Sequence, residues 1–271
     1  MSLHLKGDKG FTMLELLVAA AVSVIILGGL YLLLETGRFT TGRGDQKLQI
    51  QQSARAALDT MARDLRMAGS GLPNPVDYPN PPAAFAGAAS SSVSFLADPV
   101  NASTVLTAQA ASGATIISVS STANFSPGAT AYIFGNDGAS PNPANHWQQA
   151  TIANGGVGSN SLTFTSGLSQ TYIAGSQVSS PRTYAYDLSG TTLRRDAGDG
   201  DGPQPLAENI SGIEIKYYDK ADTEINPPSL PAHLDDIRRM EITITAFKAD
   251  PLRGDQTYVL NSSVRPRNIN D

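Results

Sequence analysis

Residues 11–34, FTMLELLVAAAVSVIILGGLYLLL, form one continuous apolar stretch that contains a single charge, Glu15. An apolar run of this length predicts a helix that spans a bilayer. At about 1.5 Å per residue it would be roughly 36 Å long, more than the roughly 30 Å of a hydrocarbon core. The glycines at 28 and 29 are tolerated better in membrane helices than in soluble ones. A carboxylate inside such a helix costs roughly 2.5 to 3.5 kcal/mol, so we expect Glu15 to have a function.

The ten residues before this run, MSLHLKGDKG, are polar and carry Lys6 and Lys9. Positive charge on this side predicts a cytoplasmic leader, with the bulk of the chain on the other side of the membrane. Two other interpretations of these residues remain open. One is an uncleaved signal anchor, and the other is a secretory signal peptide cut near residues 19–21. The second would expose a new apolar terminus, VSVIILGGLYLLL.

The junction between leader and apolar run, residues 9–15 (KGFTMLE), resembles the type IV prepilin family. The family has a short basic leader that ends in glycine, followed by Phe-Thr-x-x-Glu at the start of a hydrophobic helix. The resemblance implies that a prepilin peptidase cuts between Gly10 and Phe11 and methylates the new amine of Phe11. It also implies that Glu15, the fifth residue of the mature chain, docks the subunit into an assembly.

Elementary electrostatics agrees with these roles. An acidic side chain near a helix N-terminus is favourable, and Glu15 lies one turn from the amine that cleavage creates at Phe11. In an assembly, Glu15 can pair with the Phe11 amine of a neighbouring subunit, so that both charges leave the lipid together. Thr12 can hydrogen-bond at the same place. The alternatives are that Glu15 pairs locally with its own amine or with bilayer water, and that Thr12 only caps the helix.

An amphipathic helix is expected to follow the apolar run and to end near residues 69–73, where Gly69, Gly71 and Pro73 occur. Glycines at 37, 42 and 44 should weaken or kink it near the membrane exit. Its apolar stripe has spacings of three and four: Ile50, Ala54, Ala57, Leu58, Met61, Leu65 and Ala68. Residues 11–69 therefore match the long spine helix that the prepilin resemblance implies, with 11–34 as its transmembrane half.

The remainder, residues 70–271, predicts a β-rich head, so the fold class is α+β with an antiparallel sheet packed on the spine. Residues 70–90 are rich in proline, glycine and alanine and predict a loop. An insertion at about 101–180 is expected to form an additional β-rich part. Short β-patterned runs are separated by turn residues: 93–97, 105–109, 115–120, 129–134, 149–153, 161–165, 177–187, 191–195, 213–218, 240–248 and 258–265. The run 240–248 alternates cleanly, which predicts a sheet with one solvated face.

Composition excludes several classes of function. Cysteine is absent, so the chain can form neither disulfides nor Cys-based metal sites, and only three histidines occur, too few for a His-rich metal site. The net charge is −5 and no long basic cluster occurs, so we expect no nucleic-acid partner. We find neither a nucleophile elbow nor a phosphate-binding loop with lysine, and we expect no enzymatic activity.

One acidic, glycine-rich segment, residues 195–202, places Asp196, Asp199 and Asp201 close together in sequence. Oxygen-rich flexible loops suit Ca²⁺, although the spacing is not that of an EF-hand. Aspartate and glycine are also ordinary turn residues. A bare turn and a calcium site both remain open, and no other cofactor is expected.

Later segments are similar to the minor pilins of this family. Residues 61–69 (MARDLRMAG) resemble the end of the spine in the larger minor pilins, and stretches within about 190–270, ending in RPRN, resemble the PilW group. This resemblance implies a subunit made in the inner membrane and then extracted into an extracellular pilus. Its partners would be the prepilin peptidase, other minor pilins, the major pilin, the assembly machinery and the lipid bilayer. The J-type minor pseudopilins of type II secretion, and a membrane-anchored adhesin that presents residues 101–180, remain alternatives.

Overall fold

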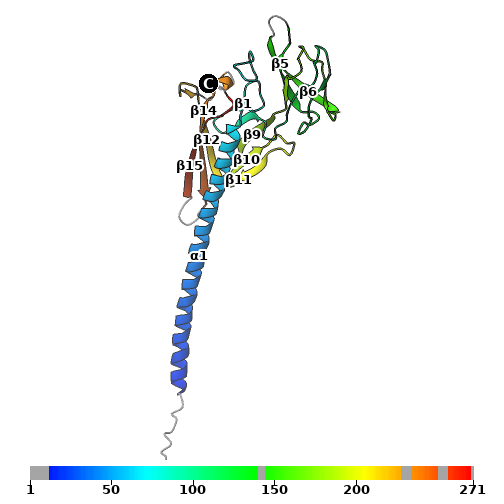
Figure 1. Cartoon of the computed structure of the whole chain (residues 1–271). Helices are drawn as coiled ribbons and strands as arrows, with labels where there is room; N and C mark the ends of the chain where they lie inside the picture. The colour runs from blue at the N-terminus through cyan, green and yellow to red at the C-terminus, as the bar shows by residue number, and fades with distance from the viewer. Residues whose placement is uncertain (1–11, 140–143, 227–232, 250–255, 270–271) are drawn as a thin grey trace, which may run out of the picture. The chain divides into compact units, whose positions relative to one another are not determined.

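The computed structural model describes residues 12–139, 144–226, 233–249 and 256–269, with only the backbone described for residues 36–46. It contains one long helix, α1 (Met13–Arg66), followed by antiparallel strands (Figure 1). The predicted α+β class is therefore confirmed. The chain divides into two compact units, Met1–Gln49 and Ile50–Asp271, and each is considered by itself.

Within the first unit, the backbone is helical from Met13 onward. The helix continues without interruption across the glycines at 37, 42 and 44, where the sequence predicted a weak point. Each glycine costs only about 1 kcal/mol in a helix interior, which weakens the helix without breaking it.

The second unit begins with the C-terminal part of α1, whose predicted stripe is buried from Ala54 to Ala68, with Ile50 partly buried against the same core. The helix ends at Arg66, and Gly69 follows with a φ of +84°, which a residue with a side chain adopts only with strain. The Gly69 amide donates to the carbonyl of Leu96 at 2.8 Å and so ties the end of the helix to a strand. The helix therefore ends three residues before Gly69, slightly earlier than the predicted range of 69–73.

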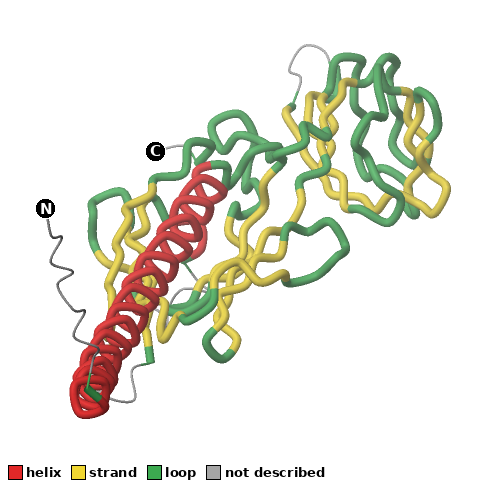
Figure 2. Tube along the Cα trace, turned by 90° about the horizontal axis from the view of Figure 1, so that it is seen from below, coloured by secondary structure: helices red, strands yellow, loops and turns green. Residues whose placement is uncertain are grey.

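Two antiparallel sheets share the core with this helix. The first has the order β1-β2-β9-β10-β11, and the second has the order β13-β12-β14-β15. Figure 2 shows strands on both sides of the helix. The strands of the first sheet are β1 (Phe85–Ala88), β2 (Val93–Ala97), β9 (Arg182–Ser189), β10 (Thr192–Asp196) and β11 (Gln204–Ala207). The strands of the second are β12 (Ile210–Tyr218), β13 (Glu224–Ile225), β14 (Arg239–Lys248) and β15 (Gln256–Val264), with a short 3-10 helix η2 (Leu234–Asp236) before β14.

A third sheet lies entirely within the predicted insertion and has its own core. Its order is β3-β8-β5-β6-β7-β4. A bridge between Leu106 and Val119, just beyond β3 and β4, joins its two edges, so the sheet closes into a small barrel. The barrel core includes Ile133, Ile152 and Tyr172. The strands are β3 (Ser103–Val105), β4 (Ile116–Ser118), β5 (Thr130–Asn136), β6 (Asn145–Val157), β7 (Ser161–Phe164) and β8 (Gln177–Ser179).

Several details differ from the sequence-based expectations. The run predicted at 105–109 is a strand only at its first residue, because β3 ends at Val105, and the two-residue β13 was not predicted. The single strand predicted at 177–187 is two strands, because the chain leaves the barrel at Pro181 and enters the first sheet. The segment predicted as loop, 70–90, contains β1. The edge strand β11 was not predicted, because Pro205 argues against a strand unless it lies at an edge.

Candidate functional site

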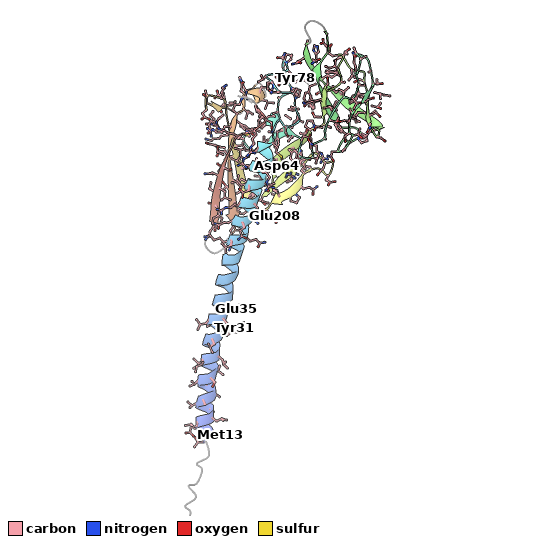
Figure 3. The ribbon with its side chains drawn as sticks, viewed as in Figure 1. Met13, Tyr31, Glu35, Asp64, Tyr78 and Glu208 are labelled. Atoms are coloured by element: carbon pink, nitrogen blue, oxygen red, sulfur yellow. The ribbon has the colours of Figure 1, made fainter. Side chains whose placement is uncertain are left out.

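The apolar part of α1 has no covering of protein side chains among the described residues. Met13–Glu35 is long and apolar enough to cross a membrane, with a mean hydropathy of 2.6. No residue in the most apolar part of this segment is buried. Leu14 and Ile25 are each 75% exposed, and apolar side chains project all around the helix (Figure 3). A helix that is apolar on every face needs lipid or other helices to cover it.

At the start of this helix, Thr12 and Glu15 form a reciprocal cap. The Glu15 amide donates to Thr12 Oγ1 at 3.3 Å, while Glu15 Oε2 accepts from the Thr12 amide and hydroxyl, both at 3.0 Å. This is a capping box, which satisfies helix N–H groups that lack partners. The carboxylate thus has hydrogen-bond partners within its own chain. Gly10 and Phe11, the predicted cleavage and methylation sites, lie outside the described residues.

Asp64 was not singled out from the sequence, and the structure places it in the core with only 4% of its surface exposed. Figure 3 labels it near the C-terminal end of α1. Its Oδ2 accepts from the hydroxyl of Tyr186 at 2.6 Å and from Nε of Arg195 at 2.7 Å. Burial, followed by the charge of Asp64, raises the pKa of the Tyr186 hydroxyl. An acidic residue directly before the buried Leu65 was the only signal in the sequence.

The three aspartates of the acidic loop do not form one ligand set. Among the described residues, no group of three His, Asp or Glu side chains is placed to hold a metal ion. Asp196 Oδ1 accepts from the Gly198 amide at 2.8 Å, and Asp199 Oδ1 accepts from the Asp201 amide at 3.2 Å. These are bonds of the aspartate turn type, in which a side chain bonds the backbone two residues on. Calcium binding here stays a prediction, and a calcium titration would test it.

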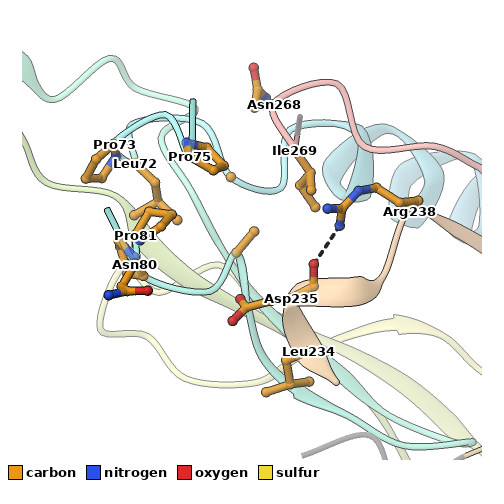
Figure 4. A pocket seen from close by; sticks show the side chains of 13 residues that line it. Leu72, Pro73, Pro75, Asn80, Pro81, Leu234, Asp235, Arg238, Asn268 and Ile269 are labelled. Carbon is orange, nitrogen blue, oxygen red and sulfur yellow. Dashed lines mark hydrogen bonds between the residues drawn. The ribbon is translucent and has the colours of Figure 1, made fainter. Parts of the chain in front are cut away.

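A cavity of about 330 Å³ lies beside the end of the helix (Figure 4). Prolines and Leu72 form much of its wall, and Arg238 lines it from the η2 side. Arg238 Nη1 donates to the carbonyl of Asp235 at 2.6 Å, whereas its buried Nε has no partner in the described part of the chain. No side-chain base stands next to a nucleophile in the lining, so the arrangement has no recognisable catalytic pair.

The barrel is fastened to the loop that follows the helix. Trp147 on β6 donates its Nε1–H to the carbonyl of Pro79 at 2.9 Å, and Asn145 donates to the carbonyl of Asp77 at 2.9 Å. The ring of Tyr78 meets Phe134 edge-on with centroids 5.6 Å apart. Trp147, the single tryptophan of the chain, therefore has a packing role here.

Comparison with known families bears on the N-terminal segment. Residues 5–31 match the prokaryotic N-terminal methylation motif. The match covers residues 5–10 of the leader, the expected Gly10–Phe11 junction, the capped Glu15 and most of the exposed apolar helix. A search of curated proteins gives no match. The chain thus carries a type IV prepilin-like N-terminus, which implies processing by a prepilin peptidase and association with pilus-type machinery.

Proposed function

We propose that this chain is a minor pilin of a type IV pilus, similar to the PilW group, that primes or caps assembly at low abundance. It is first a single-pass inner-membrane protein and then part of an extracellular fibre, beside other minor pilins and the major pilin. The observation that carries the proposal is the methylation motif at 5–31 on a helix whose apolar surface is uncovered.

That apolar surface must be covered both before and after assembly. Lipid covers the helix in the bilayer, and the apolar helices of neighbouring subunits replace lipid in a fibre. Once Gly10 is removed, the Phe11 amine and the Glu15 carboxylate are the charges closest to the helix start. Their pairing between subunits would reward correct register and penalise incorrect register, because an unpaired charge in an apolar bundle is costly.

Mass spectrometry of the N-terminus tests the first step. The protein extracted from membranes should begin at Phe11 and carry one methyl group, and Gly10→Leu should leave the uncut precursor. A wild-type protein that still begins at Met1, or that begins beyond the apolar helix, would contradict the proposal.

Two substitutions separate the cap from the docking role of Glu15. Glu15→Gln retains an acceptor for the Thr12 cap but removes the charge, whereas Glu15→Ala removes both. If docking depends on charge, both variants are processed normally and both are depleted from sheared fibres. If Glu15→Gln is incorporated like the wild type, the carboxylate serves the helix cap alone.

The same N-terminal motif suits a J-type minor pseudopilin of type II secretion, and the separately packed barrel suits an adhesin. Recovery in sheared surface fibres supports the minor pilin. A deletion strain that assembles pili but no longer releases secreted enzymes from the cell supports the pseudopilin. Binding of glycans or host protein by the chain without other pilins supports the adhesin. Under each of these proposals the chain is not an enzyme.

A further inference from the structure

The edges of the sheets are not equally protected against strand addition. The barrel has joined edges. In the first sheet, β1 is short and irregular in register, and β11 is short and contains Pro205. In the second sheet, β13 has two residues, but β15 has nine and pairs with β14 without a register shift. Within the described residues β14 is the only strand neighbour of β15, which is the outermost strand of its sheet (Figure 1).

The hydrogen bonds of the neighbouring strands show which backbone groups of β15 face outward. Ile215 on β12 donates its N–H to Ser90 at 2.8 Å, on the side away from β14. Phe247 on β14 donates its N–H to Asn209 at 2.8 Å, on the β12 side. Backbone N–H and C=O groups point to alternate sides along an antiparallel strand, and the two bonds agree on which residues point to which side. The backbone groups of odd-numbered β14 residues point toward β12, and those of even-numbered residues point toward β15.

The pairing register carries this alternation to β15. Ile244 lies opposite Leu260, and Ile242 lies opposite Ser262. These even-numbered residues of β15 therefore exchange hydrogen bonds with β14, and the odd-numbered ones direct both N–H and C=O to the open edge. The outward set includes Val259, Asn261 and Ser263, all with exposed side chains.

Within the part of the chain that the structure describes, this edge carries none of the usual devices against pairing. Natural sheets protect long edges with charges, proline, bulges or a covering element. From Gln256 to Val264 the sequence QTYVLNSSV has neither a charge nor a proline, and it contains β-favouring Thr, Tyr and Val. Val259 is 60% exposed. An evenly spaced row of outward N–H and C=O groups is complementary to one chemical partner, another extended backbone.

We infer that β15 is an interaction surface that receives an extended segment of a different subunit as a fifth strand beside β15. That the partner differs from this chain rests on the proposed function, because a low-abundance subunit has no second copy beside it. The added strand would bond Val259, Asn261 and Ser263. Its inward side chains would lie next to Leu260, which packs against the helix core, so apolar residues are expected at alternate positions.

Proline at Asn261 tests the inference directly. Its N–H faces outward, so Asn261→Pro removes an edge donor while keeping the β14 ladder, and Asn261→Ala keeps the donor. Because the chain has no cysteine, Ser263→Cys carries a benzophenone probe at one site, and Ser211→Cys on the exposed part of β12 is the matched control. Cross-linking is done on the full chain in membranes of cells that assemble the fibre.

We expect one cross-linked protein from Ser263 and none from Ser211. The yield should fall roughly tenfold with Asn261→Pro, through loss of a hydrogen bond and collision with the ring, and should not change with Asn261→Ala. Val259→Pro repeats the test should Asn261→Pro lower the unfolding temperature. An unchanged yield with a folded proline variant overturns the inference, as does a product made of two copies of this chain.

Scoring N-terminal processing and recovery in sheared fibres on the same strains separates the two proposals. A proline-sensitive cross-link in a chain that never enters fibres supports the edge and contradicts the minor pilin. Normal fibre entry with a proline-insensitive cross-link contradicts the edge alone.

Discussion

Replacing Asp64 by alanine should selectively destabilise the core between the helix and the two sheets. The substitution removes the acceptor of two hydrogen bonds, at 2.6 Å from Tyr186 and at 2.7 Å from Arg195. Hydrogen bonds to a charged group contribute about 1.5 to 3 kcal/mol each. The Arg195 side chain is 29% exposed, so water compensates part of its loss. We therefore expect a cost of about 3 to 5 kcal/mol, the range for breaking a buried pair.

Hydrogen–deuterium exchange on the full chain in detergent measures this cost by region. With about 1.36 kcal/mol per factor of ten, amides of β2, β9 and β12 should exchange about 10²- to 5 × 10³-fold faster. Amides of β5 and β6 should be unaffected, because the barrel has its own core. Asp59→Ala, at an exposed position of the same helix, should change the free energy of unfolding by less than about 0.5 kcal/mol. An effect of Asp64→Ala below about fivefold, or an equal effect in the barrel, would refute the reasoning.

Three further outcomes follow from the structure. Gly69→Ala should lower the free energy of unfolding by about 1 to 3 kcal/mol, because a Cβ would sit 3.0 Å from the carbonyl oxygen of Asn268 at positive φ. Gly202→Ala is also at positive φ but has open space around it, so it should cost only the backbone strain of about 1 kcal/mol. Trp147→Phe should speed exchange in the loop 74–82 roughly three- to tenfold through loss of one hydrogen bond, and unchanged exchange would mean that the bond fixes nothing. Hydrogen bonds from Tyr218 and Arg239 lower the pKa of Glu241 below 4.5. The stabilisation from these bonds is therefore present above pH 4.5 and is lost as the pH falls through the lowered pKa. The unfolding temperatures of wild type and Glu241→Gln should converge on acidification, and a constant difference would argue against the linkage.

Much of the fold could be predicted because its signals are local. The apolar run and the stripe from Ala54 to Ala68 follow from the helical period, and both appear where expected. β2 was predicted to the residue, and the alternation in 240–248 gave the buried face of β14. The capping box follows from Thr12 and Glu15 at a spacing of three, although the sequence left open whether Glu15 pairs within its chain.

Other features depend on which distant segments meet. Nothing near Asp64 in the sequence indicates Tyr186 or Arg195, because their contact requires the helix to pack against the first sheet. Pro181 looks like an interruption within one strand, but in the structure the chain passes there from one sheet to another.

By itself the sequence determined the membrane-competent helix, the prepilin-like junction at Gly10 and Phe11, and the β-rich character of the rest, because helical period and motif chemistry are properties of neighbouring residues. Only the tertiary structure decided that residues 103–179 close into a barrel, that Asp64 is buried with two partners, and that β15 has an open edge among the described strands. The physical reason is that strand order and hydrogen-bond direction are set by pairing across long sequence separations, which no local pattern of side chains specifies.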